Sequence, residues 1–166
     1  MPLMQFQNAD ARIVYLATLY HLGRPGSEAA AEAAQRDDLG LRAVHDALLP
    51  YLDLAVVEVE LSPYQVVRLA TALLGVTNEL KQYGIANGRS SVPRFEETMA
   101  FLFSETAEDP GSAMDLAGRP VELRRRIEGA VAQAEAELSA AQSEAQEQQR
   151  AERGRWWQLW RRGDGN

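Results

Sequence analysis

The sequence predicts a mainly α-helical fold, with one short strand or small ribbon and a long C-terminal helix. Apolar residues recur every three or four positions over most of the chain, and they alternate with polar residues only across 54–61. Of the 166 residues, 46% are hydrophobic and 25% are charged, the balance of a folded chain. This length suits one domain, or one domain plus an arm, and we expect the helical core to span residues 8–106.

Three helices are expected before the strand. The first spans 10–22, where Asp10 can cap an apolar stripe that recurs at i, i+3, i+4 and i+7. The stripe consists of Ile13, Leu16, Ala17 and Tyr20. A second helix is expected over 27–37, and all its apolar residues are alanines. A third should cover 41–49 and end at Pro50, because proline lacks the amide hydrogen that a helix needs.

A strand and a long helix should follow. In 54–61 apolar residues alternate with glutamates, so one face of the strand is buried and the other is wet. Ser62 and Gln65 have the spacing of a capping box, with Pro63 at the first helical position. The helix that they open should end at Gly84, and its wide apolar face makes it the expected centre of the fold.

The C-terminal third is expected to be helical with one interruption. We predict a helix over 93–106, a loop over 107–119, and a long acidic, alanine-rich helix over 120–153. Apolar residues of the long helix are spaced alternately four and three apart, like a coiled-coil seam. These seam residues are Ile127, Val131, Ala134, Leu138, Ala141 and Ala145. Gly154 should break this helix and leave a separate tail over 154–166.

The N-terminal part also carries a family likeness. Leu39-Gly40-Leu41 stands ahead of the third expected helix, and an apolar run over 54–59 follows that helix. In this order of helices and strand, residues 10–61 resemble the winged helix-turn-helix family. The resemblance implies a DNA-binding scaffold whose recognition helix would present Arg42 and His45 to the groove.

The charge distribution is uneven. The formal net charge of the chain is −7. Residues 150–166 hold five arginines against Glu152 and Asp164, a net of +3, so residues 1–149 carry −7 − 3 = −10. Because a nucleic-acid binder is usually basic, this acidic body disfavours DNA as the partner.

The tail is the most distinctive segment. All three tryptophans of the chain lie in it among arginines. Tryptophan prefers the headgroup boundary and arginine attracts anionic lipid, but the same residues could also anchor in a partner's groove or stack on single-stranded nucleic acid. Folding back onto the core is a further alternative. The expected partner- or membrane-binding residues are Arg153, Arg155, Trp156, Trp157, Leu159, Trp160, Arg161 and Arg162.

The residue inventory excludes several kinds of chemistry. The chain has no cysteine, two histidines and a single lysine, Lys81, so thiolate metal sites, disulfides and histidine-rich metal sites are ruled out. The sequence contains no phosphate-binding glycine loop, zinc-protease motif or EF-hand spacing. We therefore assign no catalytic residue, no metal ligand and no cofactor, and we expect a protein that is not an enzyme.

These observations favour a non-enzymatic regulatory or adaptor protein that acts through protein–protein contacts, in part through the tail. A homodimer fits the alanine seam. The alternatives are a dimeric, winged-helix-like transcriptional regulator that binds DNA, and a peripheral protein attached to an anionic membrane surface. Because no secretory signal and no long apolar window stand out, we expect a cytoplasmic protein that is free or membrane-peripheral.

Overall fold

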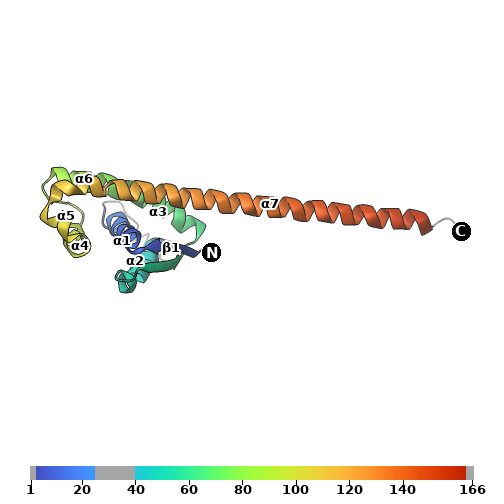
Figure 1. The fold of residues 1–166 in the computed structure, drawn as a ribbon, viewed down its shortest axis with the longest axis horizontal. Helices are drawn as coiled ribbons and strands as arrows, with labels where there is room; N and C mark the ends of the chain where they lie inside the picture. Colours follow the sequence, from blue (N-terminus) through green and yellow to red (C-terminus); the bar gives the residue numbers. More distant parts are fainter. Residues whose placement is uncertain (1–2, 25–39, 164–166) are drawn as a thin grey trace. The chain divides into compact units, whose positions relative to one another are not determined.

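The computed structural model describes residues 3–24 and 40–163, with the side chains of 151–163 left out. Within these ranges α-helices dominate, beside one small sheet and a long C-terminal helix, so the predicted fold class is confirmed (Figure 1). In chain order the elements are β1 (Leu3–Gln7), α1 (Asn8–Gly23), α2 (Arg42–Leu48), η2 (Leu49–Tyr51), β2 (Val56–Glu60), α3 (Pro63–Ile85), α4 (Phe95–Leu102), α5 (Ser104–Glu108), η3 (Pro110–Ser112), α6 (Ala113–Leu116) and α7 (Gly118–Gly163). The helix expected over 27–37 lies outside the described residues.

The chain divides into two units. The first comprises Met1–Ile127 and the second Glu128–Asn166, so the boundary falls inside α7. The first unit therefore extends past the expected core of residues 8–106 in both directions. It gains the N-terminal strand at one end and the first turns of α7 at the other.

The sheet is an antiparallel ribbon of two strands. The alternation in 54–61 marks β2 correctly, with Val57 and Val59 buried and the glutamates exposed. Its partner β1, which the sequence analysis missed, pairs Phe6 with Val57 and Met4 with Val59. Phe6 is 2% exposed and closes the ribbon onto the core. Gln5 adds a cross-strand hydrogen bond from its side-chain amide to Glu58, at 2.7 Å.

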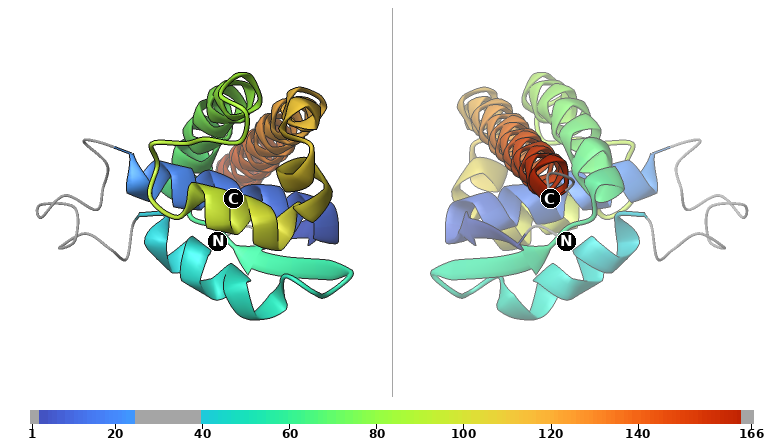
Figure 2. Two further views of the ribbon diagram at one scale, coloured as in Figure 1. Left: turned by 90° about the vertical axis from the view of Figure 1, so that its left-hand side faces the viewer. Right: turned by 90° about the vertical axis from the view of Figure 1, so that its right-hand side faces the viewer.

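Helix α1 is the buried centre of the first unit. It contacts α2, α3 and α4, and Figure 2 shows it between α3 on one side and α2 with the ribbon on the other. Its buried residues are Ala11, Ile13, Val14, Tyr15, Leu16, Ala17, Thr18, Leu19 and His21. A helix that is apolar on all sides belongs inside a core. The predicted apolar stripe covers only part of the buried surface of α1. Helix α1, rather than α3 as expected, is the central helix of the first unit.

The start of α1 also differs from its prediction. Gln7 is the N-cap and makes no side-chain capping bond. Asp10 lies in the first turn instead, where a carboxylate suits the positive end of the helix dipole. Its Oδ2 accepts a hydrogen bond from Arg126 of α7 at 2.6 Å. Asp10, the predicted cap, therefore links α1 to the buried start of α7.

Helix α3 confirms its predicted start and shifts its end. The Ser62 hydroxyl accepts a hydrogen bond from the backbone amide of Gln65 at 3.2 Å, and the backbone amide of Ser62 donates to Oε1 of Gln65 at 2.8 Å. The helix continues through Gly84 to Ile85, and the left-handed residues are Asn87 and Gly88. A Cβ added to Gly84 would lie 3.1 Å from the Pro110 carbonyl oxygen. This glycine thus permits a close approach of η3, rather than ending the helix.

The segment after α4 differs from the prediction. Helix α4 spans Phe95–Leu102 and stops at Phe103, whose backbone angles of φ −135° and ψ 59° are not helical. Residues 107–119 are not a loop, because α5, η3 and α6 fill most of the segment with short helical turns. Ala113 and Ala117 are buried there and pack these turns into the first unit. Gly154 does not break α7, which runs to Gly163.

Candidate interaction surfaces

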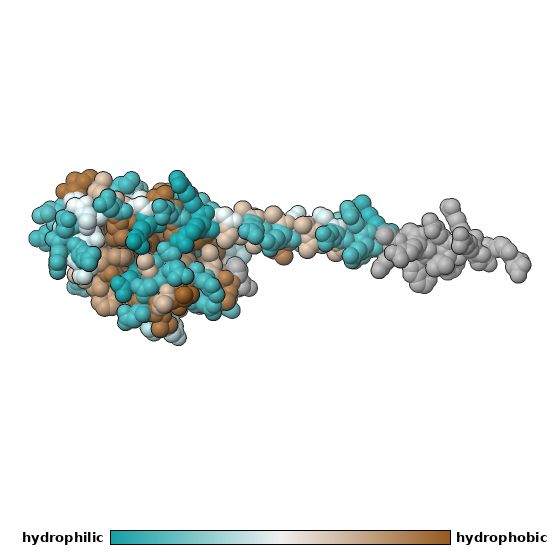
Figure 3. Space-filling view, viewed as in Figure 1, coloured by the Kyte–Doolittle hydropathy of each residue, from teal (hydrophilic) through white to brown (hydrophobic). Residues whose placement is uncertain are grey.

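The part of α7 beyond Ile127 carries the predicted seam on an exposed helix. Leu123 and Ile127 are 2% and 1% exposed, and they anchor the start of α7 in the first unit. From Glu128 to Arg150 every side chain is exposed except Val131, which is partly buried. Leu138 is 64% exposed. Figure 3 shows hydrophilic and weakly apolar residues intermixed along this stretch.

The exposed stretch contains little that would stabilise a single helix. Residues 129–149, here called the acidic stretch, hold four glutamates and no basic residue. Ion pairs four residues apart, which strengthen exposed helices, therefore cannot form inside it. Its side-chain hydrogen bonds are local: Gln133 donates to Glu137 at 3.0 Å, and Ser143 donates to the Ser139 carbonyl at 3.0 Å. The alanines, glutamates and glutamines of the acidic stretch favour the helix only through their intrinsic helix propensity.

The tail predicted from sequence is the end of this same helix. The backbone of α7 is helical up to Gly163. The side chains of the eight residues predicted to bind a partner or membrane, Arg153 to Arg162, lie outside the described residues. No helix in the described ranges is both long enough and apolar enough to cross a bilayer.

The two residues predicted to face DNA lie on α2. His45 does not project freely into solvent, because its ring stacks on Tyr15 of α1, with centroids 4.1 Å apart and planes 19° apart. Its Nδ1 lies 2.8 Å from the Thr18 hydroxyl. His45 is therefore partly buried and held against α1. Arg42 is partly buried at the start of the same helix.

The Thr18 hydroxyl joins two partners. Its oxygen lies 2.8 Å from the Tyr15 carbonyl oxygen and 2.8 Å from Nδ1 of His45, so the ring is held by a hydrogen bond as well as by stacking on Tyr15. Burial lowers the pKa of His45 below its ordinary value, and the nearby Asp46 carboxylate opposes that shift. The ring is a neutral structural group that joins α2 to α1.

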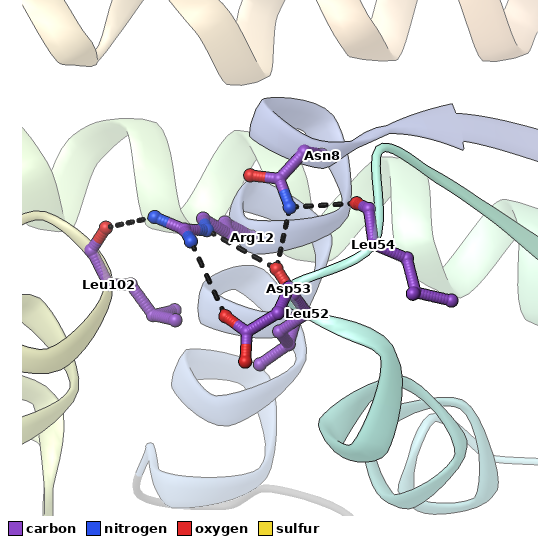
Figure 4. Close-up of polar contacts among 6 residues, drawn as sticks. All are labelled: Asn8, Arg12, Leu52, Asp53, Leu54 and Leu102. Carbon is purple, nitrogen blue, oxygen red and sulfur yellow. Dashed lines mark hydrogen bonds and ion pairs between the residues drawn. The ribbon is translucent and has the colours of Figure 1, made fainter.

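A second polar cluster ties three segments of the first unit together (Figure 4). The guanidinium of Arg12 donates to the Leu52 carbonyl at 3.5 Å and to the Leu102 carbonyl at 3.2 Å. It also lies 3.8 Å from the carboxylate of Asp53, whose side chain is 97% exposed. Asn8 donates to the Leu52 carbonyl as well, at 2.6 Å. These contacts satisfy the carbonyl of Leu52, the residue after η2, and the last carbonyl of α4, so the cluster is a structural clip.

Sequence reasoning missed both polar clusters. The sequence analysis assigned no role to Thr18 or Arg12, because apolar periodicity gives no signal for the partner of a polar side chain. In the described part of the chain, no group of three or more histidine, aspartate or glutamate side chains could hold a metal ion. The seam of α7 is an extended candidate surface, and large apolar side chains are also exposed on the first unit, among them Tyr51, Leu54 and Val56.

Comparison with known proteins adds no assignment. No family model, no curated protein and no solved structure matches this chain.

Proposed function

We propose that this protein is a non-enzymatic regulatory or adaptor protein, and that α7 beyond Ile127 provides its contact surface for another protein. One observation carries the proposal: an apolar seam lies along a helix whose side chains are exposed from residue 128 to 150, apart from Val131. The first unit supplies a folded base. The exposed helix offers the seam as binding surface along its length.

Helix energetics support this reading. Isolated helices are marginal in water, and tertiary packing of one face supplies most helical stability in proteins. The acidic stretch lacks internal ion pairs, so a partner's apolar surface is the missing contribution. Alanines at the seam let a partner helix approach closely, and Val131 and Leu138 provide the larger contacts.

Site-specific photo-crosslinking of the full chain tests this proposal. Gln142 lies beside the seam, and Gln133 lies on the opposite face of the same helix. A photoreactive residue at 142 should give a crosslinked protein product in the cells that make the chain. The same residue at 133 should give far less. Equal yields at both positions, or none at either, would contradict the proposal.

Matched substitutions test the seam itself. Ala134→Gln with Ala141→Gln places two amides on the seam, while Ala136→Gln with Ala140→Gln places the same two on the opposite face. Helix propensity and charge change equally in both pairs. The seam pair should reduce the crosslink from position 142 at least tenfold, and the opposite pair should leave it within about twofold. Equal effects would mean that the seam is not the contact.

The tryptophan- and arginine-rich tail belongs to the same proposal as an additional anchor. Aromatic side chains and arginine are enriched at interface hot spots. Deleting residues 154–166 should weaken partner capture and leave the thermal midpoint of the chain unchanged. If the deletion instead abolishes flotation with anionic vesicles and spares the protein crosslink, the tail serves a membrane rather than a protein.

A further inference from the structure

Helix α7 contains two stretches of opposite charge. The acidic stretch, 129–149, carries four glutamates and no cation, a net of −4. The following stretch, 150–162, is here called the basic stretch. It carries five arginines and Glu152, so its net charge is 5 − 1 = +4. Both stretches lie within one continuous helical backbone.

We infer that the occupant of the seam is a second copy of the chain, docked antiparallel, so that the acidic stretch of each copy lies beside the basic stretch of the other. This inference rests on the proposed function. Charge complementarity selects the orientation. A parallel pair in register would place the glutamates of both copies side by side, whereas the antiparallel pair sets −4 against +4 twice.

The geometry of the helix allows this pairing. The midpoints of the two stretches are residues 139 and 156, so the two-fold axis would pass near residue 147 or 148. Residue 163 of one copy would then lie near residue 132 of the other. The paired region begins at residue 132, so it does not require Leu123 or Ile127, which are already buried in the first unit.

The seam and the charges play different roles in this dimer. Alanine buries little apolar surface, so the seam alone contributes little binding free energy. The attraction between the acidic and basic stretches is exposed to solvent, so added salt should weaken it. The Debye length shortens from about 10 Å at 0.1 M to about 3 Å at 1 M. The inference therefore predicts a weak, salt-sensitive dimer.

Sedimentation of the full chain over a concentration series tests self-association. We expect reversible dimerisation at low salt and a dissociation constant at least about tenfold weaker at 1 M salt. A chain that remains monomeric at about 100 µM and low salt would overturn the inference. The crosslink from position 142 would then still decide the proposed function, because a product with a different protein supports it without a dimer.

Distances between spin labels test the orientation. The chain has no cysteine, so Ser139→Cys and Ser143→Cys can each carry a single label on the exposed helix. In the antiparallel dimer the distance between copies should be about 10 Å longer at 139 than at 143, because each residue from the axis adds about 3 Å. A parallel dimer would give equal distances and would overturn the inference.

Charge reversal provides the second variant. Arg153→Glu with Arg155→Glu should weaken the dimer about tenfold or more. Glu137→Arg with Glu144→Arg should do the same. Mixing the two variants should strengthen association, because the intact acidic stretch of one variant, at −4, then meets the intact basic stretch of the other, at +4, while the two altered stretches are each neutral. Association of the mixed variants no stronger than that of either alone would contradict the antiparallel arrangement.

Discussion

At the residue scale, the first unit is held by polar groups whose partners lie far away in the sequence. Thr18 is fully buried and links the Tyr15 carbonyl to His45 of α2. Arg12 joins α1 to the ends of η2 and α4. Neither role could be predicted from sequence, because periodicity shows which face of a helix is apolar and does not show which distant carbonyl it meets.

The Thr18–His45 contact predicts a pH-dependent stability. The folded pKa of His45 lies below the unfolded value of about 6.5. The unfolded chain therefore binds the proton first, and stability is lost as the pH falls from about 6.5 through the folded pKa. Urea unfolding from pH 8 to pH 5 should show this loss, and His45→Gln should flatten it. An unchanged slope in the variant would contradict the assignment.

The Arg12 clip predicts a contrast between two substitutions. Arg12→Met keeps the aliphatic stem but removes the donors to two backbone carbonyls, so it should cost about 1–3 kcal/mol of unfolding free energy. Asp53→Ala removes only an exposed partner at 3.8 Å, and it should cost less than about 0.5 kcal/mol. Urea denaturation of both variants checks this order. Equal losses would show that the ion pair matters more than the carbonyl bonds.

At the element scale, sequence patterns located most helices and misjudged their ends. The Ser62 capping box is local, so it could be predicted from spacing alone. The end at Ile85 is followed by left-handed angles at Asn87 and Gly88, and the Gly88 amide donates to the Tyr83 carbonyl at 2.9 Å. The sequence analysis assigned this terminating role to Gly84 instead of Gly88. Strand β1 was missed because Leu3–Gln7 becomes a strand only by pairing with β2, a partner distant in the sequence.

The packing of α1 against α3 predicts the effect of filling one glycine. A Cβ at Gly75 would lie 2.3 Å from Cε1 of Tyr20, too close for the ring to stay in place. Alanine gains about 1 kcal/mol of helix propensity, but overpacking costs about 1–3 kcal/mol. Gly75→Ala should thus lower the thermal midpoint. Gly129→Ala in α7, with no atom within 4 Å of its added Cβ, should not lower it.

At the scale of the whole molecule, burial divides the chain at Ile127, whereas the charge changes sign further along α7, at Arg150. Buried apolar side chains occur up to Ile127, and the described side chains beyond it are exposed or partly buried. The acidic body and the basic end are facts of the sequence itself, because formal charge is counted from the residues. The sequence analysis could not predict that Gly154 lies within a helix, since a single glycine costs only about 1 kcal/mol against a long run of good helix formers.

This division predicts that the second unit contributes little to the stability of the first. A chain ending at Ile127 should have an unfolding free energy within about 0.5 kcal/mol of that of the whole chain. Urea unfolding followed by far-ultraviolet circular dichroism measures both values. A large loss would show that residues 128–166 pack on the first unit in solution.

Amide hydrogen exchange of the dilute full chain tests the central claim, that α7 beyond Ile127 is an exposed binding helix, most directly. We predict that peptides from 128–150 exchange orders of magnitude faster than peptides from α3, and that they become protected as the chain concentration rises. Protection equal to that of α3 in the monomeric chain would contradict the account, because the helix would then have its partner within its own chain.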